Sequence, residues 1–130
     1  MKRIIPAILL ATIWISVSEF VRNQFWLNSY WTAHYTGMGL VFPQAPANGA
    51  VWGIWSLCFA GCIYVLSRRF SLRETAALAW VIGFVLMWLV IGNLGVLPMG
   101  LLPVAVPLSM LEAFGAAWII HRIAGPRQTA

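Results

Sequence analysis

The sequence predicts an all-α membrane protein, a four-transmembrane-helix bundle, from its composition, its four apolar stretches and the placement of its basic residues. Of the 130 residues, 62% are hydrophobic and 8% are charged, whereas about a quarter of a soluble domain is charged. A small soluble domain leaves roughly a third or more of its surface exposed. A chain this apolar therefore needs lipid to cover it, and we expect residues 1–130 to form a single transmembrane domain.

Four apolar stretches have the length of a membrane span. They cover residues 4–21, 49–66, 75–93 and 101–121, and each is close to the ~20 residues that cross the hydrocarbon core as a helix. Proline and glycine separate the first stretch from the second and the third from the fourth. Ser71 and Glu74 have the S-x-x-E spacing of a capping box ahead of the third stretch. We predict one helix in each.

The basic residues predict the orientation. Cytoplasmic loops carry an excess of Lys and Arg, and all but one of the eight basic residues fit a single topology: Lys2, Arg3, Arg68, Arg69, Arg73, Arg122 and Arg127. We therefore expect both termini to be cytoplasmic in a bacterial inner membrane. Arg22 alone falls on the opposite side. The net charge of +5 then reflects membrane orientation, so we expect no nucleic-acid partner.

The first stretch has a second interpretation. "MKRIIPAILLATIWISVSEF" also has the basic start, apolar run and small residues of a secretory signal peptide. Its apolar run is at the upper end of the length for such a segment, and we predict an uncleaved first helix.

Aromatic residues mark the segment after the first helix. The outer loop 22–48 is nearly uncharged and contains Trp26, Trp31 and Tyr35. Amphipathic rings of this kind gather at membrane interfaces. Residues 24–36 are expected to form a helix that lies in the outer interface or folds over the mouth of the bundle. An aromatic ligand site is the alternative.

Glu112 lies in the middle of the last apolar stretch. A charged side chain at the bilayer centre costs at least ~2.5 kcal/mol, so it needs a partner, water or a proton. Its helical neighbours at three and four residues are Leu108, Ser109, Gly115 and Ala116, and together with Ala105 they form a largely small, weakly polar face. Small residues allow close helix packing, so we expect Glu112 to face the bundle interior.

Other polar residues recur at helical spacing and predict a cavity that opens outside and ends at Glu112. The candidates for a ligand or proton site are Glu112, Ser109, Ser56, Ser16, Glu19, Arg22, Asn23, Asn93 and His34, with Trp52, Trp55 and Trp88 as walls. The alternative is that each polar residue only binds a neighbouring helix. Glu19 and Arg22, three residues apart, either form an interfacial ion pair or leave Arg22 to hold an anionic ligand.

No metal site or cofactor is expected from the sequence. Cys58 and Cys62 are four residues apart on one face of the second stretch. Two thiols without further Cys or His make an incomplete metal site, and they are expected to be packing residues. His34 alone in an aromatic loop is expected to be a polar tip at the interface.

The aromatic segment "FWLNSYWTAHY" and the Pro-rich final helix "LPVAVPLSMLEAFGAAWIIHRI" together resemble small bacterial inner-membrane proteins of families of unknown function. That resemblance covers most of the chain and implies a location without an activity. The small multidrug resistance transporters offer a physical analogy, because they are four-helix proteins with one membrane-embedded Glu. In those transporters the acid lies in the first helix, and here it lies in the last.

Three function classes follow. The first is a non-enzymatic accessory, assembly or oligomerising bundle, with the bilayer and a second copy or a larger membrane complex as partners. The second is a small proton-coupled transporter or ligand-binding protein that uses Glu112. The third is a membrane enzyme that uses Glu19, Arg22 and His34, which no nucleophile or metal set accompanies. The sequence favours the first by a small margin.

Overall fold

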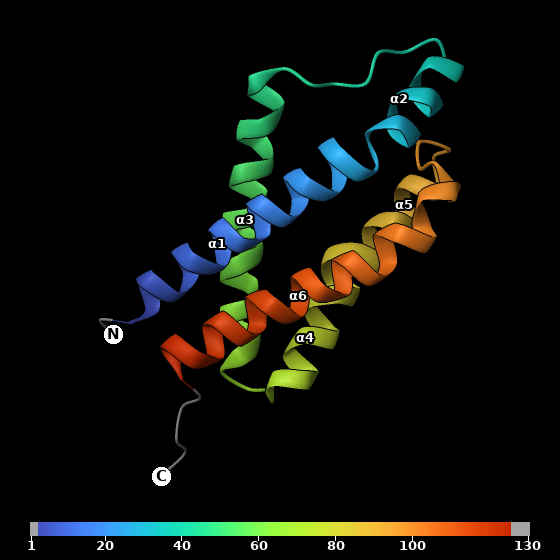
Figure 1. Ribbon diagram of the computed structural model, residues 1–130. Coiled ribbons are helices and arrows are strands. Elements are labelled where there is room, and N and C mark those ends of the chain that lie inside the picture. Colours follow the sequence, from blue (N-terminus) through green and yellow to red (C-terminus); the bar gives the residue numbers. More distant parts are fainter. Residues whose placement is uncertain (1–2, 126–130) are drawn as a thin grey trace.

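The computed structural model describes residues 3–125, and every regular element within them is a helix (Figure 1). In chain order the elements are α1 (Ile4–Phe20), η1 (Val21–Trp26), α2 (Asn28–Gly37), α3 (Pro46–Ser67), α4 (Leu72–Trp80), η2 (Val81–Val85), α5 (Leu86–Asn93), η3 (Met99–Leu101) and α6 (Leu102–Ala124). The segments η1 and η2 are π-helical, and η3 is a 3-10 turn.

Four helical stretches within residues 3–125 are long and apolar enough to cross a membrane. They are Ile4–Trp26, Pro46–Ser67, Leu72–Asn93 and Met99–Ala124. The predicted all-helical fold with four apolar helices is confirmed. Lys2 and Arg127, two of the basic residues that predict the orientation, lie outside the described residues.

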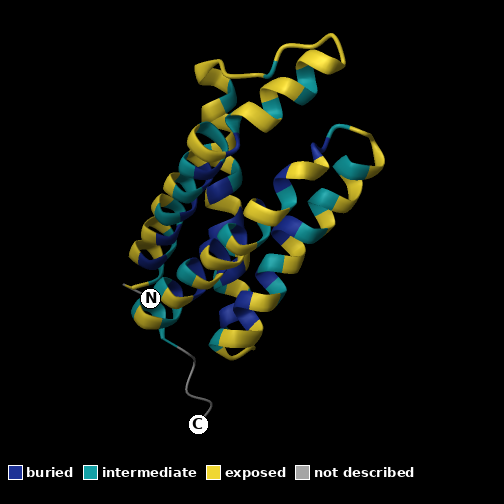
Figure 2. Ribbon diagram, turned by 45° about the vertical axis from the view of Figure 1, so that its right-hand side comes forward, coloured by how far each residue is buried: buried dark blue, intermediate teal, exposed yellow. Residues whose placement is uncertain are grey.

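The four stretches alternate in direction (Figure 1). Helix α6 packs along α1 and α4, and α1 also packs on α3. We call the end that carries α2, residues 38–45 and the turn at 94–98 the α2 end; residues 68–71 lie at the opposite end. Buried residues line the inner sides of the helices, whereas the outer sides are largely exposed (Figure 2). The exposed side chains are mostly large and apolar, as a surface in contact with lipid requires.

Local sequence accounts for the helix boundaries. The capping box expected at Ser71 is present, since the Ser71 side chain accepts from the backbone N–H of Glu74 and the Glu74 carboxylate accepts from the Ser71 backbone N–H. Pro46 and Pro103 stand in the first turns of α3 and α6, where the missing N–H has no intrahelical partner to lose. Gly95 turns the chain between α5 and η3 with φ of 75°, a conformation that favours glycine.

The largest departure from the sequence-based boundaries is at the end of the first helix. The sequence predicts that the first helix ends at residue 21 and that a separate helix begins at residue 24. Both boundaries are wrong, because the first helix continues through η1 to Trp26. The charge of Arg22 suggested exposure, whereas its side chain is buried against partners from its own helix and α6. Helix α2 begins at Asn28, four residues after the expected start.

Helices α1 and α6 approach each other closely at Gly115. A Cβ atom at this position would lie 2.6 Å from the Trp14 ring. That ring is held in place, because Trp14 Nε1 donates to the carbonyl of Glu112 at 2.9 Å. The small face predicted around Glu112 thus lets a tryptophan of the first helix lie directly on α6.

Replacing Gly115 with Ala should lower the thermal unfolding temperature of the protein in detergent. We expect a loss of about 1–3 kcal/mol, since the added methyl group would push against the fixed Trp14 ring. Gly61→Ala in α3 is the matched control, because a Cβ there meets nothing within 4 Å. That control should be neutral or more stable by up to about 1 kcal/mol from helix propensity. Equal unfolding temperatures for the two variants would contradict the close approach.

Candidate functional site

The side chain of Arg22 is buried between two carboxylates from different helices. Its Nη1 donates to Glu112 Oε2 of α6 at 2.7 Å, and its Nη2 donates to Glu19 Oε1 one turn earlier in α1. Arg22, Glu19 and Glu112 are only 5%, 6% and 1% exposed. We call these three residues the charge cluster. The expectation that Glu112 faces the interior is correct, and so is the pairing of Glu19 with Arg22.

Two π-helical segments position Arg22. In η1 the N–H of Leu27 bonds to the carbonyl of Arg22 at 2.9 Å, a five-residue step that adds one residue to the turn. In η2 a similar bond joins Leu86 to Val81, and η2 carries Phe84. The Arg22 guanidinium lies over the Phe84 ring, 5.0 Å from its centroid, in the arrangement of a cation–π contact. Single π-helical turns are frequent at functional sites.

Hydrogen bonds extend the charge cluster to α2. Asn23 Nδ2 donates to Glu19 Oε2 at 2.8 Å, and Trp31 Nε1 donates to Asn23 Oδ1 at 3.0 Å. Both oxygens of Glu19 therefore accept a hydrogen bond. These hydrogen bonds connect α2, through the first helix, to Glu112 of α6. A shift of α2 could therefore alter the hydrogen bonding of the charge cluster.

Glu112 is less fully paired than Glu19. Its Oε2 accepts from Arg22, but its Oε1 is buried without a hydrogen-bond partner among residues 3–125. A buried polar atom without a partner costs free energy. The cluster also contains one guanidinium and two carboxylates, so its fully ionised form carries one excess negative charge. Burial makes such a charge costly unless a proton or another cation compensates it.

A cavity of about 750 Å³ lies on the α2 side of the charge cluster. Its lining comes from residues 16–35, the segment before α3, the first half of α3, α5, the turn after α5, η3 and the start of α6. The lining residues are Ser16, Glu19, Phe20, Arg22, Asn23, Gln24, Leu27, Trp31, Tyr35, Phe42, Pro43, Gln44, Ala45, Pro46, Asn48, Gly49, Trp52, Gly53, Ser56, Met87, Trp88, Ile91, Val96, Leu101 and Ala105. Most of the wall is apolar and aromatic. Glu19 and Arg22 supply the charged groups of the lining.

The structure brings many of the sequence-predicted residues to this cavity. Those that line it are Ser16, Glu19, Arg22, Asn23, Ser56, Trp31, Tyr35, Trp52 and Trp88. Glu112 and Ser109 are not in the lining. Arg22 stands between the cavity and Glu112, and Ser109 accepts from Trp80 Nε1 at 2.9 Å deeper in the helix bundle. The cavity therefore reaches the charge cluster at Glu19 and Arg22 rather than ending at Glu112 itself.

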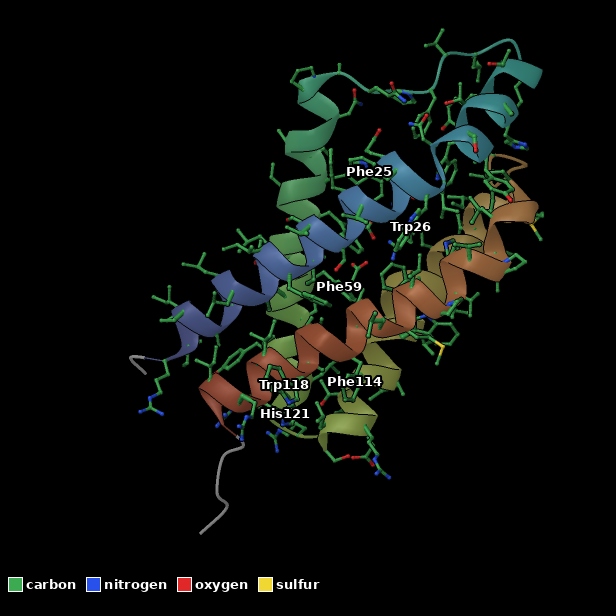
Figure 3. All side chains as sticks on the ribbon, in the orientation of Figure 1. Phe25, Trp26, Phe59, Phe114, Trp118 and His121 are labelled. Atoms are coloured by element: carbon green, nitrogen blue, oxygen red, sulfur yellow. The ribbon has the colours of Figure 1, made fainter. Side chains whose placement is uncertain are left out.

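Other predicted residues lie outside the cavity. Asn93 is exposed at the end of α5, and Trp26 is exposed on η1 beside Phe25, toward the α2 end (Figure 3). The Trp55 ring stacks on the Phe59 ring, with 4.9 Å between the two ring centroids. His34 Nε2 lies 2.8 Å from the carbonyl of Gly95. Of the set Glu19, Arg22 and His34 that the enzyme hypothesis uses, only Glu19 and Arg22 line the cavity.

The glycines of the second stretch have a different role from the one their spacing suggests. Gly49 and Gly53 form a GxxxG step, a pattern typical of tight helix packing. A Cβ at either position would meet nothing within 4 Å, and both residues line the cavity. Because these glycines have no side chain, they leave space in the cavity, and they do not form a contact surface for another helix. Cys58 and Cys62 are exposed rather than packed, and no group of three metal-binding side chains occurs among residues 3–125.

Sequence reasoning missed two parts of the site. Phe84 gave no signal, because a phenylalanine in an apolar helix is ordinary. The pairing of Arg22 with Glu112 did leave a signal, since Arg22 is the one basic residue that the membrane orientation does not explain. A single basic residue near the end of one apolar helix and a single acidic residue inside another can be expected to pair, because buried charges require a partner.

Comparison with known proteins adds no functional information. No protein family, curated protein or solved structure matches the chain. The resemblance to small bacterial membrane proteins therefore stays a prediction, and function has to be inferred from the geometry of the cavity and the charge cluster.

Replacing Arg22 with Gln should strongly destabilise the protein. The change removes the cation that the two buried acids Glu19 and Glu112 share, and breaking a buried ion pair in this way costs about 3–5 kcal/mol. The additional changes Glu19→Gln and Glu112→Gln should restore much of the loss, because the triple variant buries no charge at the cluster. Thermal unfolding in detergent measures both effects. A triple variant less stable than Arg22→Gln alone would contradict this account.

Proposed function

We propose that this chain is a multi-pass membrane protein that binds a small amphipathic molecule in the cavity above the charge cluster. The observation that carries the proposal is the cavity itself. Its volume of about 750 Å³ is within the ~300–1,000 Å³ of small-molecule sites, which also combine apolar walls with a few convergent polar groups. Glu19, Arg22 and Asn23 provide such polar groups at one side of an otherwise largely apolar wall.

The lining supports an amphipathic ligand over a fully polar one. Trp31, Trp52 and Trp88 line the cavity, and aromatic side chains bind apolar groups with large contact areas. A fully polar molecule would leave these rings in poor contact, and a fully apolar one would leave the cluster without a partner. A molecule with one polar end and an apolar body satisfies both.

The basic residues support one orientation in the membrane. Arg68, Arg69 and Arg73 lie at the end of the bundle opposite α2. By the positive-inside rule that end is cytoplasmic, so the cavity and α2 are on the outer side of a bacterial inner membrane. In this orientation the exposed Tyr30 of α2 and the exposed Phe25 and Trp26 of η1 lie at the outer interface.

An accessory or assembly role was the interpretation that the sequence favoured. The sequence supports that role by the absence of catalytic motifs and by the small-residue faces of the helices, and such faces serve equally well to pack helices within one copy. No contact among residues 3–125 favours that role over ligand binding. The cavity is the feature that favours ligand binding over an assembly role, since an assembly subunit does not require a cavity.

Filling the cavity should abolish ligand binding without unfolding the protein. Gly53→Leu places a side chain where a Cβ meets nothing within 4 Å, inside the cavity. Gly61→Leu makes the same change on the same helix outside the cavity and is the matched control. Binding of tetraphenylphosphonium, tetraphenylborate and the neutral triphenylphosphine oxide to the purified protein in detergent is measured by calorimetry. We expect at least one of the three to bind to the Gly61→Leu protein and to bind at least about tenfold more weakly to Gly53→Leu.

Equal binding by the two folded leucine variants would contradict the proposal. So would a native protein that binds none of the three probes.

The proposed orientation is tested by labelling single cysteines in whole cells. In a Cys58→Ala, Cys62→Ala background, Leu94→Cys at the α2 end and Arg69→Cys at the opposite end place one thiol at exposed positions. A membrane-impermeant maleimide should label Leu94→Cys in intact spheroplasts and Arg69→Cys only after lysis. The reverse pattern would invert the topology.

A further inference from the structure

We propose that the charge cluster makes the cavity selective for amphipathic cations, and that cation binding releases one proton from the Glu112 carboxyl. This inference rests on the proposed ligand-binding function and names the chemical class of its ligand. It follows from three features of the cluster: its charge, the unequal pairing of its two acids and its position beside the cavity.

The charge of the cluster favours a cation. Arg22 contacts one oxygen of Glu19 and one of Glu112, so two carboxylates share one guanidinium. An excess negative charge in a dry interior is expensive, and it is compensated either by a proton or by a second cation nearby. An anionic ligand would place an uncompensated negative charge beside Glu19, and it would have to displace a carboxylate from Arg22 to reach the guanidinium.

The pairing of the two acids identifies Glu112 as the proton carrier. Glu19 accepts hydrogen bonds at both oxygens, from Arg22 and Asn23. Such bonds stabilise the ionised form of a carboxyl group. Glu112 has one oxygen bonded to Arg22 and the other buried without a partner among the described residues. A proton on that free oxygen removes the excess charge and leaves both contacts of Arg22 in place.

No other titratable group on the helices packed against Glu112 is placed to supply the missing charge. In α4, Glu74 is engaged in the capping box at the opposite end, and in α3 the thiols of Cys58 and Cys62 are exposed. The remaining titratable side chains of α3, α4 and α6 lie toward or at the opposite end: Tyr64, Arg73, His121 and Arg122. Of these, His121 contacts Thr75. The charge state near Glu112 is therefore set by Glu19, Arg22 and Glu112 alone within residues 3–125.

The cavity is placed so that its ligand senses this charge. Glu19 and Arg22 line it, whereas Glu112 lies behind Arg22. A cation bound beside Glu19 brings one positive charge to the cluster, and the Glu112 O–H bond then breaks to release its proton to water. Before binding the cluster holds Arg22⁺, Glu19⁻ and neutral Glu112; afterwards it holds Arg22⁺, Glu19⁻, Glu112⁻ and the cation. The total charge is zero in both states.

The test compares two probe ions of the same shape and opposite charge. Tetraphenylphosphonium is a permanent cation and tetraphenylborate is its anionic counterpart, so neither can gain or lose a proton itself. Each is titrated into the full chain in nonionic detergent by calorimetry, in phosphate and in Tris buffer. The two buffers differ in their heat of ionisation, and the difference in observed heat therefore counts the protons released.

We expect the cation to bind at least about tenfold more tightly than the anion. Each bound cation should release about one proton, so its affinity should rise by up to about tenfold per pH unit, as linkage requires. In Glu112→Gln the proton release and the pH dependence should both disappear. Glu74→Gln is the matched control, since it removes an exposed carboxylate outside the cluster and should leave binding and proton release unchanged.

Equal affinity for the two ions, or cation binding by the native protein without proton release, would overturn this inference. The proposed function would survive that result as long as Gly53→Leu still weakens binding of either ion. Absence of binding by both ions and by neutral triphenylphosphine oxide would instead overturn the proposed function itself. Both decisive measurements use the native chain, so the inference stays testable even if Glu112→Gln fails to fold.

Discussion

A single buried guanidinium links the first helix of this protein to the last. Arg22 has two carboxylate partners, Glu19 on its own helix and Glu112 on α6. Charged groups in an apolar interior are stable only when they are paired and hydrogen-bonded. The relative position of α1 and α6 is therefore constrained, because sliding one helix past the other would separate Arg22 from Glu112. The Trp14 contact with the α6 backbone and Gly115 enforces the same register.

The cavity exists because the bundle is closed on one side of Arg22 and open on the other. Phe59 of α3 packs on Phe84 of η2, and Phe84 in turn contacts Trp88, so aromatic rings join α3 to the third stretch beside the charge cluster. Toward the α2 end, Gly49 and Gly53 leave space along α3. The charged groups thus lie at the boundary between the tightly packed part of the bundle and the cavity. This position makes Glu19 and Arg22 available to a ligand.

Part of the candidate site could be predicted, because a polar side chain in an apolar helix costs free energy unless it faces the interior of the bundle. Glu112 was expected inside the bundle, and Glu19, Asn23, Ser16 and Ser56 on the inner sides of their helices, because helical periodicity places polar and small residues on one face. The error was in exposure. Arg22 and Glu19 are expected from the sequence as a solvated pair, whereas both side chains are buried in the bundle, since each neutralises part of the charge of the other.

Composition and hydropathy determined the all-helical fold with four long apolar helices, since a helix satisfies its own backbone polar groups where water is scarce. Local signals determined where several helices begin, as at Ser71, Pro46 and Pro103. Only the tertiary structure decided that Arg22 reaches Glu112. Those residues are 90 positions apart, and no periodicity relates two different helices. The π-helical turns that bring Arg22 onto Phe84 depend likewise on packing between helices, which no local pattern encodes.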